Sequence, residues 1–222
     1  MCSFLITNIK EITEQINRLN RKLQHRGPDR TTMLQIKYKQ QQLTFLHNLL
    51  SITGSTHNKK NQPFTNSDES IIAIYNGEIY NYKKFITQTP SQTYLLGNNQ
   101  LSDGECLIPA YLKYGPTFAQ QLEGEFAIAL FDLNKNILVV SSDIFATKPM
   151  YLSFHDGKFG ISSYKYALEE MGFREHYKMQ ENTILMIDLL THQISYLGKV
   201  YEFNLKQYKH NYNDWEAAFN KA

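Results

Sequence analysis

The chain has 222 residues, which is long enough to bury a sizeable core as one large domain or two small ones. The net charge is +2 and basic and acidic residues are interleaved, so the composition gives no argument for a nucleic-acid partner. Apolar runs are too short to span a bilayer, and the N-terminus lacks the basic region of a signal peptide. We therefore expect neither a membrane partner nor export.

The chain contains two cysteines, Cys2 and Cys106. This number excludes a disulfide framework and makes the cytoplasm the expected location. No CxxC motif and no His/Cys pair at zinc spacing is present, so we expect no metal site. Cys106 lies in the apolar run "CLIPAYL", and we interpret it as a residue of a helix core.

The first fifty residues predict a strand, a helix and a second strand. "CSFLIT" is typical of a short buried strand, and apolar residues from Ile9 to Leu23 recur at steps of three and four, as on one helix face. Gly27 and Pro28 in "HRGPD" end that helix. "LTFLHNLLSI" predicts the second strand, and residues 53–69 predict a polar loop.

The middle of the chain predicts a strand followed by helices. "SIIAIYNGEIYNY" indicates a buried strand that enters a sharp turn at Asn76-Gly77, a dipeptide that accepts positive φ. "NYKKFITQ" and "SDGECLIPAYLKYG" predict helices. The second helix is expected to begin with Ser102 or Asp103 as N-cap and with Glu105 in its first turn.

From residue 122 onward the sequence predicts hairpins. "EFAIALFDLNKNILVVSSD", "MYLSFHDGKFGISS" and "TILMIDLLTHQISYLG" each contain two apolar strands around a polar turn, and "YALEEMG" predicts a short helix that ends at Gly172. Many hairpins with few helices indicate the α+β class, with helices packed outside antiparallel sheets. The polar tail after residue 205, with a helical end, is interpreted as an exit from the domain.

Cys2 is the first candidate catalytic residue. Removal of Met1 would place its thiol beside a free α-amino group with a pKa of about 8, which can act as a base for a thiol with a pKa of about 8.5. The alternative interpretation is that Cys2 is a small apolar residue that opens a strand. Position alone favours that alternative.

Two further segments could bind a substrate. A turn at Asn76-Gly77 can aim a side-chain amide and a backbone N–H at one point, as a tetrahedral oxyanion requires, or it can be a plain tight turn. Asp103 can hold a substrate ammonium group or cap its helix. Glu78 has the same ambiguity.

Taken in order, the motifs "MCSFLI", "HRGPDR", "NGEIYNY", "SDGECL", "LEGEFAIALFD" and "KPMY" resemble the class II glutamine amidotransferase domain of asparagine synthetases. The resemblance covers Met1 to about residue 205. It implies an N-terminal nucleophile hydrolase fold, a four-layer αββα sandwich of two antiparallel sheets flanked by helices. It also implies a domain over residues 2–205, with residues 206–222 as a linker or the start of a synthetase domain.

The resemblance implies a role for each candidate residue. Cys2 attacks the side-chain amide of glutamine, and Asn76 and Gly77 form the oxyanion hole. Glu78 and Asp103 bind the substrate's α-amino group, and the backbone around Leu50 and Ile52 lines the pocket. The ammonia passes to an ATP-dependent synthetase domain. ATP and Mg are therefore expected in that domain, and no cofactor is expected in this one.

One position departs from the family pattern in a way that bears on the substrate. The family strand carries "H-x-R-L-S-I", whose arginine binds the α-carboxylate of glutamine, and here Leu49 stands at the arginine position in "HNLLSI". Loss of such a contact should cost on the order of 2–5 kcal/mol in binding. Three explanations are open: another cation such as Arg30 compensates, the substrate lacks this carboxylate, or the site is decaying.

Other departures concern the surroundings of the site. The family's "D-x-x-G-x-[KR]-P" appears as "DIFATKP", with Ala146 for glycine, and Tyr164 stands where glutamate is common. We interpret both as drift in packing or in the surface facing the next domain. No Ser-Gly-Gly-x-Asp pyrophosphate loop occurs. We therefore expect either that this chain is a fragment of a longer protein that contains the synthetase domain, or that the synthetase is a separate partner. Whether the protein forms a homodimer is left open by the sequence.

The leading hypothesis is a glutaminase domain that supplies ammonia to an asparagine-synthetase-like domain or partner. The first alternative is a hydrolase of another amide without the α-carboxylate. The second is a non-catalytic domain that docks on or shapes a synthetase. Under that second alternative Met1 can stay in place, because Cys2 needs no free amine.

Overall fold

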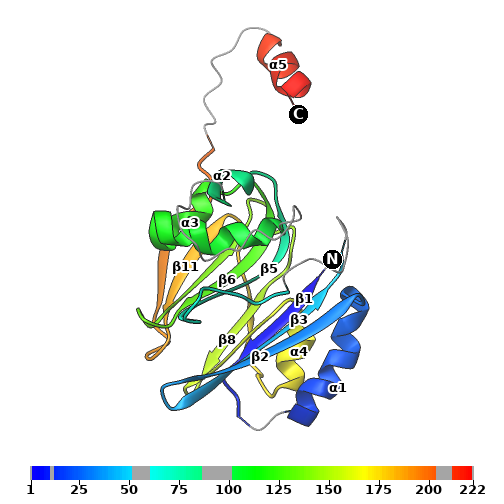
Figure 1. The fold of residues 1–222 in the computed structure, drawn as a ribbon, viewed down its shortest axis with the longest axis vertical. Coiled ribbons are helices and arrows are strands. Elements are labelled where there is room, and N and C mark those ends of the chain that lie inside the picture. The colour runs from blue at the N-terminus through cyan, green and yellow to red at the C-terminus, as the bar shows by residue number, and fades with distance from the viewer. Residues whose placement is uncertain (1, 11–12, 52–60, 87–101, 204–211, 222) are drawn as a thin grey trace.

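The computed structural model describes residues 2–10, 13–51, 61–86, 102–203 and 212–221. Within these ranges the strands form two six-stranded antiparallel sheets (Figure 1). The first sheet has the order β10-β8-β9-β1-β3-β2, and its strands are β1 (Ser3–Thr7), β2 (Arg30–Tyr38), β3 (Gln41–Leu49), β8 (Tyr151–His155), β9 (Lys158–Ser162) and β10 (Tyr177–Lys178). The second has the order β12-β11-β7-β6-β5-β4, and its strands are β4 (Phe64–Thr65), β5 (Ile71–Ile79), β6 (Gly124–Asp132), β7 (Ile137–Ser142), β11 (Thr183–Asp188) and β12 (Ile194–Gly198).

Helices cover the outer face of each sheet. The α-helices are α1 (Thr13–Leu23), α2 (Lys83–Ile86), α3 (Leu107–Tyr114), α4 (Lys165–Glu170) and α5 (Asn213–Lys221), and the 3₁₀ helices are η1 (Gln24–Arg26), η2 (Asp103–Cys106) and η3 (Gly115–Gln121). α1 and α4 lie on the first sheet, whereas α2 and α3 lie on the second (Figure 1). The layers therefore follow the order helix, sheet, sheet, helix.

Three apolar cores hold the four layers together. Between the two sheets, the rings of Phe45 and Phe131 meet edge to face with centroids 5.1 Å apart. Ile16, Leu19 and Leu23 of α1 are fully buried against the first sheet, at the helical spacing that the sequence predicts. The third core lies between the second sheet and α3. These cores confirm the predicted four-layer α+β sandwich.

The predicted turn at Asn76-Gly77 is wrong, because both residues lie inside β5. Asn76 pairs with Ala127 and Gly77 with Phe126, and the chain turns only after Ile79. Gly77 is needed for close packing and not for a turn: a Cβ there would stand 2.1 Å from the carbonyl oxygen of Glu125. Any larger residue would push β6 away from β5.

The other predicted elements are present, but the strands β2, β4 and β10 were not predicted. The hairpin turn at Asp156-Gly157 has φ values of 48° and 71°, as a two-residue turn requires. Phe64–Thr65, inside the predicted polar loop, form the short strand β4. Residues 53–60 of that loop, Ile52 at the end of the predicted strand before it, and residues 87–88 of the helix predicted at "NYKKFITQ" lie outside the described residues.

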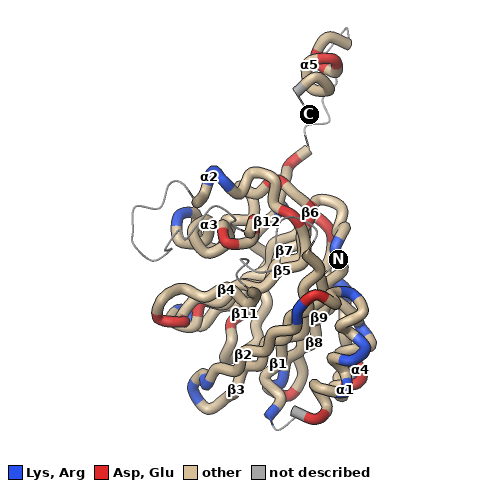
Figure 2. The backbone as a smooth tube through the Cα atoms, turned by 45° about the vertical axis from the view of Figure 1, so that its right-hand side comes forward, with Lys and Arg blue, Asp and Glu red and all other residues tan. Residues whose placement is uncertain are grey.

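The surface carries charged residues of both signs and the exposed C-terminal helix. Basic and acidic residues are scattered along the backbone, and Arg18, Arg21 and Lys22 lie together on α1 (Figure 2). The predicted helical tail is present as α5, where Trp215 and Phe219 are 77% and 84% exposed. The domain boundary near residue 205 stays a prediction.

Ala146 occupies the position where the family pattern has glycine, and its backbone explains that pattern. Its φ of 48° lies in the left-handed region, which costs a non-glycine residue about 1–2 kcal/mol. Glycine removes that cost, but it destabilises the fold by about 0.5–1 kcal/mol because it increases the conformational entropy of the unfolded chain. Ala146→Gly is therefore expected to raise the free energy of unfolding by about 0.5–1 kcal/mol, measured by urea titration. Ala110→Gly, in the right-handed helix α3, is expected to lower it, and the same sign for both variants would contradict the explanation.

Candidate active site

The alternation of side chains along the strands decides which residues face the space between the sheets. In β1, Phe4 and Ile6 lie in the core between the sheets, whereas Leu5 faces the α1 layer. Two residues before Phe4, Cys2 continues the row that faces the second sheet.

The second sheet presents its candidate residues to the same space. In β5, Ile72 and Ile74 lie in the core between the sheets, and Asn76 and Glu78 follow at steps of two. β1 and β5 approach each other across that core. The predicted nucleophile and the NGE motif, which lie far apart in the chain, are therefore directed toward the same space between the sheets.

The thiol of Cys2 is half-buried and held by the backbone of Leu50. The Leu50 N–H donates to Sγ at 3.4 Å, and Sγ lies 3.8 Å from the Leu50 carbonyl oxygen. A hydrogen bond donated to sulfur favours the thiolate, which is the reactive form. Leu50, expected to line the substrate pocket, thus contacts the nucleophile through its main chain.

The HRGPD loop holds the segment around Leu50 in place. Asp29 N–H donates to the Leu49 carbonyl at 3.1 Å, and Ser51 N–H donates to Asp29 Oδ2 at 2.6 Å. Gly27 packs so closely that a Cβ would stand 2.2 Å from the carbonyl oxygen of Asn48. The loop therefore fixes the backbone that contacts the Cys2 sulfur.

The backbone N–H of Gly77 points away from β6. Its partner Phe126 donates its N–H to Asp143 Oδ2 at 3.0 Å, and its carbonyl accepts from Asp143 N–H at 2.9 Å. Directly opposite residues in an antiparallel ladder exchange both hydrogen bonds or neither. Because Phe126 bonds to Asp143 instead, Gly77 belongs to a pair without ladder bonds, and its N–H faces the other edge of β5.

On that edge, the neighbouring N–H groups are bonded to side chains. Tyr75 N–H donates to Gln62 Oε1, and Ile79 N–H donates to Asp103 Oδ2, both at 2.7 Å. Among the described residues we find no acceptor for the Gly77 N–H that lies between them. Together with the adjacent amide of Asn76, it can stabilise an oxygen that develops negative charge.

Asp103 joins the start of η2 to the end of β5. Ser102 and not Asp103 is the N-cap, since Ser102 N–H donates to Glu105 Oε1 at 3.2 Å. Burial raises the pKa of the Tyr75 phenol well above its ordinary value, and the charge of Asp103 and a hydrogen bond to it raise that pKa further. The charges of Cys106 and Cys2 add smaller contributions to the same shift.

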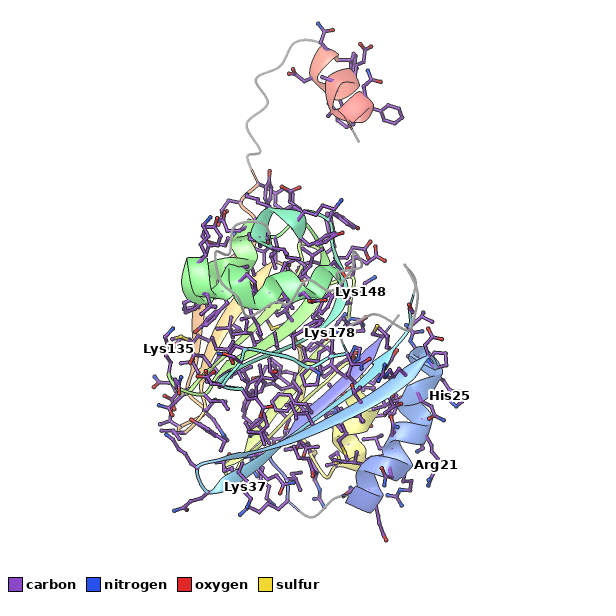
Figure 3. All side chains as sticks on the ribbon, viewed as in Figure 1. Arg21, His25, Lys37, Lys135, Lys148 and Lys178 are labelled. Atoms are coloured by element: carbon purple, nitrogen blue, oxygen red, sulfur yellow. The ribbon has the colours of Figure 1, made fainter. Side chains whose placement is uncertain are left out.

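The sequence did not single out Glu125, which lies opposite Glu78 on the face toward the first sheet. Its carboxylate accepts from Lys148 Nζ at 2.7 Å and from the Tyr80 hydroxyl at 3.0 Å. These bonds, that of Lys148 first, lower the pKa of the Glu125 carboxyl. Figure 2 shows acidic residues at the end of β6 nearest the N-terminus, and Figure 3 labels Lys148 in the same region. The pairing register that reveals Glu125 could not be obtained from the sequence.

Three further residues that the sequence singled out are Leu49, Ile52 and Cys106. Leu49 is half-buried at the end of β3, next to the segment that contacts Cys2. Ile52, predicted to line the pocket, lies outside the described residues. Cys106 is fully buried, and burial raises the pKa of its thiol, which agrees with a core residue and not with a nucleophile.

The described residues contain no group of three or more His, Cys, Asp or Glu side chains that could hold a metal ion. In the same part of the chain, no helix is long and apolar enough to cross a membrane.

Comparison with known proteins gives the family. The model of the glutamine amidotransferase domain matches residues 1–209. The chain belongs to the glutamine amidotransferase domain family. This class II amidotransferase domain is similar to "Amidase chyE" of Penicillium rubens, with 34% identity over 142 residues, which cover 63% of this chain and 20% of that protein. It is also similar to the glutamine-hydrolysing asparagine synthetase of Asparagus officinalis, with 32% identity over 146 residues, which cover 65% of this chain and 23% of that protein.

Solved structures agree with the fold of this amidotransferase domain. The glutamine phosphoribosylpyrophosphate amidotransferase of B. subtilis has a TM-score of 0.65 at 14% identity, with 91% of this chain and 50% of that chain covered. The comparisons confirm the predicted family, the resemblance to asparagine synthetases and the N-terminal nucleophile hydrolase fold. The domain spans about a fifth to a quarter of the two curated relatives, so the activity of a whole protein is a matter for proposal.

His47 lies two residues before Leu49 on the same face of β3 and predicts an effect of pH on stability. It is 1% exposed, Nε2 has no hydrogen-bond partner among the described residues, and burial lowers its pKa from 6.5 to about 3. As pH falls below 6.5, the unfolded chain binds a proton that the folded domain excludes. The contribution of neutral His47 to the free energy of unfolding is therefore fully present above pH 6.5 and is lost as the pH falls from 6.5 to 3.

The expected loss from His47 between pH 7 and 5 is about 2 kcal/mol, at 1.36 kcal/mol per pH unit below 6.5. The variant His47→Phe keeps a ring but cannot titrate. Urea titrations at both pH values should show that the free energy of unfolding falls by about 2 kcal/mol less in the variant. Equal losses in the two proteins would mean that His47 is protonated in the folded domain.

Proposed function

We propose that this domain hydrolyses glutamine to glutamate and ammonia, with Cys2 as the nucleophile after removal of Met1. The observation that carries the proposal is the Leu50 N–H at the Cys2 sulfur, opposite the strand whose Gly77 N–H faces an open edge. A nucleophile and an oxyanion site on facing strands are what acyl transfer from an amide requires.

The proposed reaction needs no residue outside this site for its covalent steps. The α-amino group of Cys2 takes the thiol proton, and Sγ attacks the amide carbon of glutamine. The carbonyl oxygen becomes an oxyanion bound by the Asn76 amide and the Gly77 N–H. When the tetrahedral intermediate collapses, the carbon–nitrogen bond breaks, the α-ammonium returns the proton to the leaving nitrogen, and ammonia departs from a thioester.

The second half of the proposed reaction regenerates the enzyme. Water attacks the thioester carbon, with the Cys2 amine again as the base, and the oxyanion forms at the same place. Release of glutamate returns the proton to the thiol. Glu78 and Asp103 supply the negative charge for the substrate's α-ammonium group, and Asp103 is held in position by the Ile79 N–H.

We further propose that the ammonia is used by an ATP-dependent, asparagine-synthetase-like domain, in cis or in trans. The similarity to asparagine synthetases, of which the matched segments cover 23% and 27%, supports such a partner. ATP and Mg belong to that domain, and no cofactor is required for the chemistry of this one. Residues 2–205 would form the amidotransferase domain, residues 206–222 would lead to the synthetase domain, and the cytoplasm would be the location.

A second candidate function is hydrolysis of an amide that lacks an α-carboxylate. Leu49 favours it, because an apolar side chain stands where the family pattern has an arginine. A relative of similar identity is called an amidase, which also supports this candidate. The two functions differ in the substrate and share the nucleophile.

Ammonia release from glutamine tests the first function. Intact mass should show a chain without Met1, and coupled detection of ammonia should show turnover in proportion to the processed fraction. A glutamine-analogue electrophile should add one label, at Cys2. Retention of Met1, with no label and no ammonia at high glutamine concentration, would support a non-catalytic domain instead.

A further inference from the structure

We propose that Arg30 binds the α-carboxylate of glutamine in place of the arginine that the family pattern has at position 49. This inference rests on the proposed function and names the residue that recognises its substrate. It follows from the strand register, the orientation of the side chains and the pairing of the other cations near the site.

Leu49 belongs to the row of β3 that faces the second sheet. Leu43 and Phe45 of that row lie in the core between the sheets, whereas Leu46 packs against the α1 layer. Leu49 is four residues beyond Phe45 and shares its side of the strand. A carboxylate that reaches this place meets hydrocarbon, which cannot replace its water.

Arg30 is the direct cross-strand partner of Leu49. In β2, Leu34 and Ile36 pack against the core between the sheets, so Arg30, at the same parity, starts on that side. Directly opposite residues have Cβ atoms about 4.5–5.5 Å apart, within reach of a long side chain. The guanidinium of Arg30 can therefore occupy the space that an arginine at position 49 would use.

Cys2 lies next to Leu49 on the edge of β3 opposite to Arg30, because β1 and β2 pair with the two edges of β3. In the ladder between β1 and β3, Ser3 pairs with Asn48, so the next step of the register puts Cys2 opposite Leu49. Cys2 and Arg30 are thus two strand spacings apart, roughly 10 Å between their backbones. The side chains of Cys2 and Arg30 fill part of this distance, and a glutamine between them can place its amide carbon at the thiol and its carboxylate toward the guanidinium.

Two other basic residues near the site are engaged elsewhere, although Arg26 Nε has no hydrogen-bond partner among the described residues. Lys148 is paired with Glu125 at 2.7 Å. The guanidinium of Arg26 lies 5.8 Å from the ring centroid of Tyr164, a residue that packs in the α1 and α4 layer. Arg30 is exposed at the end of the edge strand β2, and within the described ranges we find neither an ion pair nor a side-chain hydrogen bond for it. It is the cation best placed to meet the carboxylate.

The test compares steady-state kinetics of ammonia release for the wild type, Arg30→Ala, Leu49→Arg and the double variant. Arg30→Ala is expected to raise the KM for glutamine about ten- to a hundredfold with little change in kcat, since one charge-assisted contact is lost. Leu49→Arg should lower KM, and in the double variant it should restore the binding that Arg30→Ala lost. Lys37→Ala removes an exposed cation from the other end of β2 (Figure 3) and should leave KM unchanged.

A second substrate separates carboxylate recognition from other effects of the substitution. 4-Aminobutanamide is glutamine without its carboxylate, and Arg30→Ala should leave kcat/KM for it unchanged. An unchanged KM for glutamine in Arg30→Ala, while the wild type is active, would overturn this inference and leave the glutaminase function standing. An equal loss with both substrates would also overturn it. Absence of glutamine hydrolysis in every protein would remove the proposed function and the inference with it.

Discussion

Replacing Cys2 by alanine is expected to abolish ammonia release, with kcat reduced at least about a thousandfold, as for loss of a catalytic nucleophile. The structure gives this residue a sulfur that accepts the Leu50 N–H at 3.4 Å and a position between the two sheets. Alanine removes the bond-forming sulfur and keeps the free α-amine. The fold should be unaffected, because Cys2 precedes β1 and is half-buried.

The second cysteine supplies a matched control for this prediction. Cys106→Ala should keep kcat and KM for glutamine, since Cys106 is fully buried in the core that covers the second sheet. Cys106→Ala is expected to lower the free energy of unfolding by about 1 kcal/mol, because it leaves a small cavity. Labelling by a glutamine-analogue electrophile should persist in Cys106→Ala and disappear in Cys2→Ala. Full activity in Cys2→Ala would place the chemistry elsewhere.

The sequence predicted the fold class because its hairpins carry local signals. Each apolar strand pair of the C-terminal half is joined by a short turn, and at Asp156-Gly157 the turn residues adopt positive φ. The buried face of α1 was equally local, with Ile16, Leu19 and Leu23 at helical spacing. Such patterns need no knowledge of what packs against them.

The structure differed from the sequence prediction where contacts between distant segments decide the conformation. Asn76-Gly77 has the composition of a turn, yet the pairing of Gly77 with Phe126 keeps it in a strand. β2 has half-buried residues at every second position from Thr32 to Ile36, an alternation too weak to predict a strand from the sequence alone. In both cases a neighbouring strand, absent from any local window, determines the outcome.

In the candidate site, too, local motifs indicated the residues, whereas their contacts with distant segments could not be predicted. Motif resemblance indicated Cys2, Asn76, Gly77, Glu78 and Asp103, and the strand alternation directs Cys2, Asn76 and Glu78 into the space between the sheets. Their hydrogen-bond partners were not predictable. Lys148 with Glu125, and Gln62 with the Tyr75 N–H, depend on the register between segments that are far apart in the chain. Arg30 was one candidate for a compensating cation on the sequence alone, and the pairing of β2 and β3 places it directly opposite Leu49.

Asn76→Ala is expected to reduce kcat for glutamine about a hundred- to a thousandfold with a small change in KM. Removal of one oxyanion donor has an effect of this size, because the contact is made mainly in the transition state. Asn76 is 4% exposed and faces the first sheet, beside the Gly77 N–H on the edge of β5. The Gly77 N–H should account for the activity that remains.

Two further variants distinguish loss of the oxyanion donor from damage to the strand. Asn76→Asp keeps the shape but replaces the donor by an acceptor, so it should reduce kcat at least as much as Asn76→Ala. Asn66→Ala removes an amide that accepts from the Ile71 N–H at 2.8 Å at the start of the same strand, and it should lower stability by about 1 kcal/mol with kcat retained. If Asn76→Ala and Asn66→Ala changed kcat equally, Asn76 would act by supporting β5. If only the Asn76 variants lost kcat while their urea midpoints stayed near that of the wild type, the amide would act on the developing oxyanion.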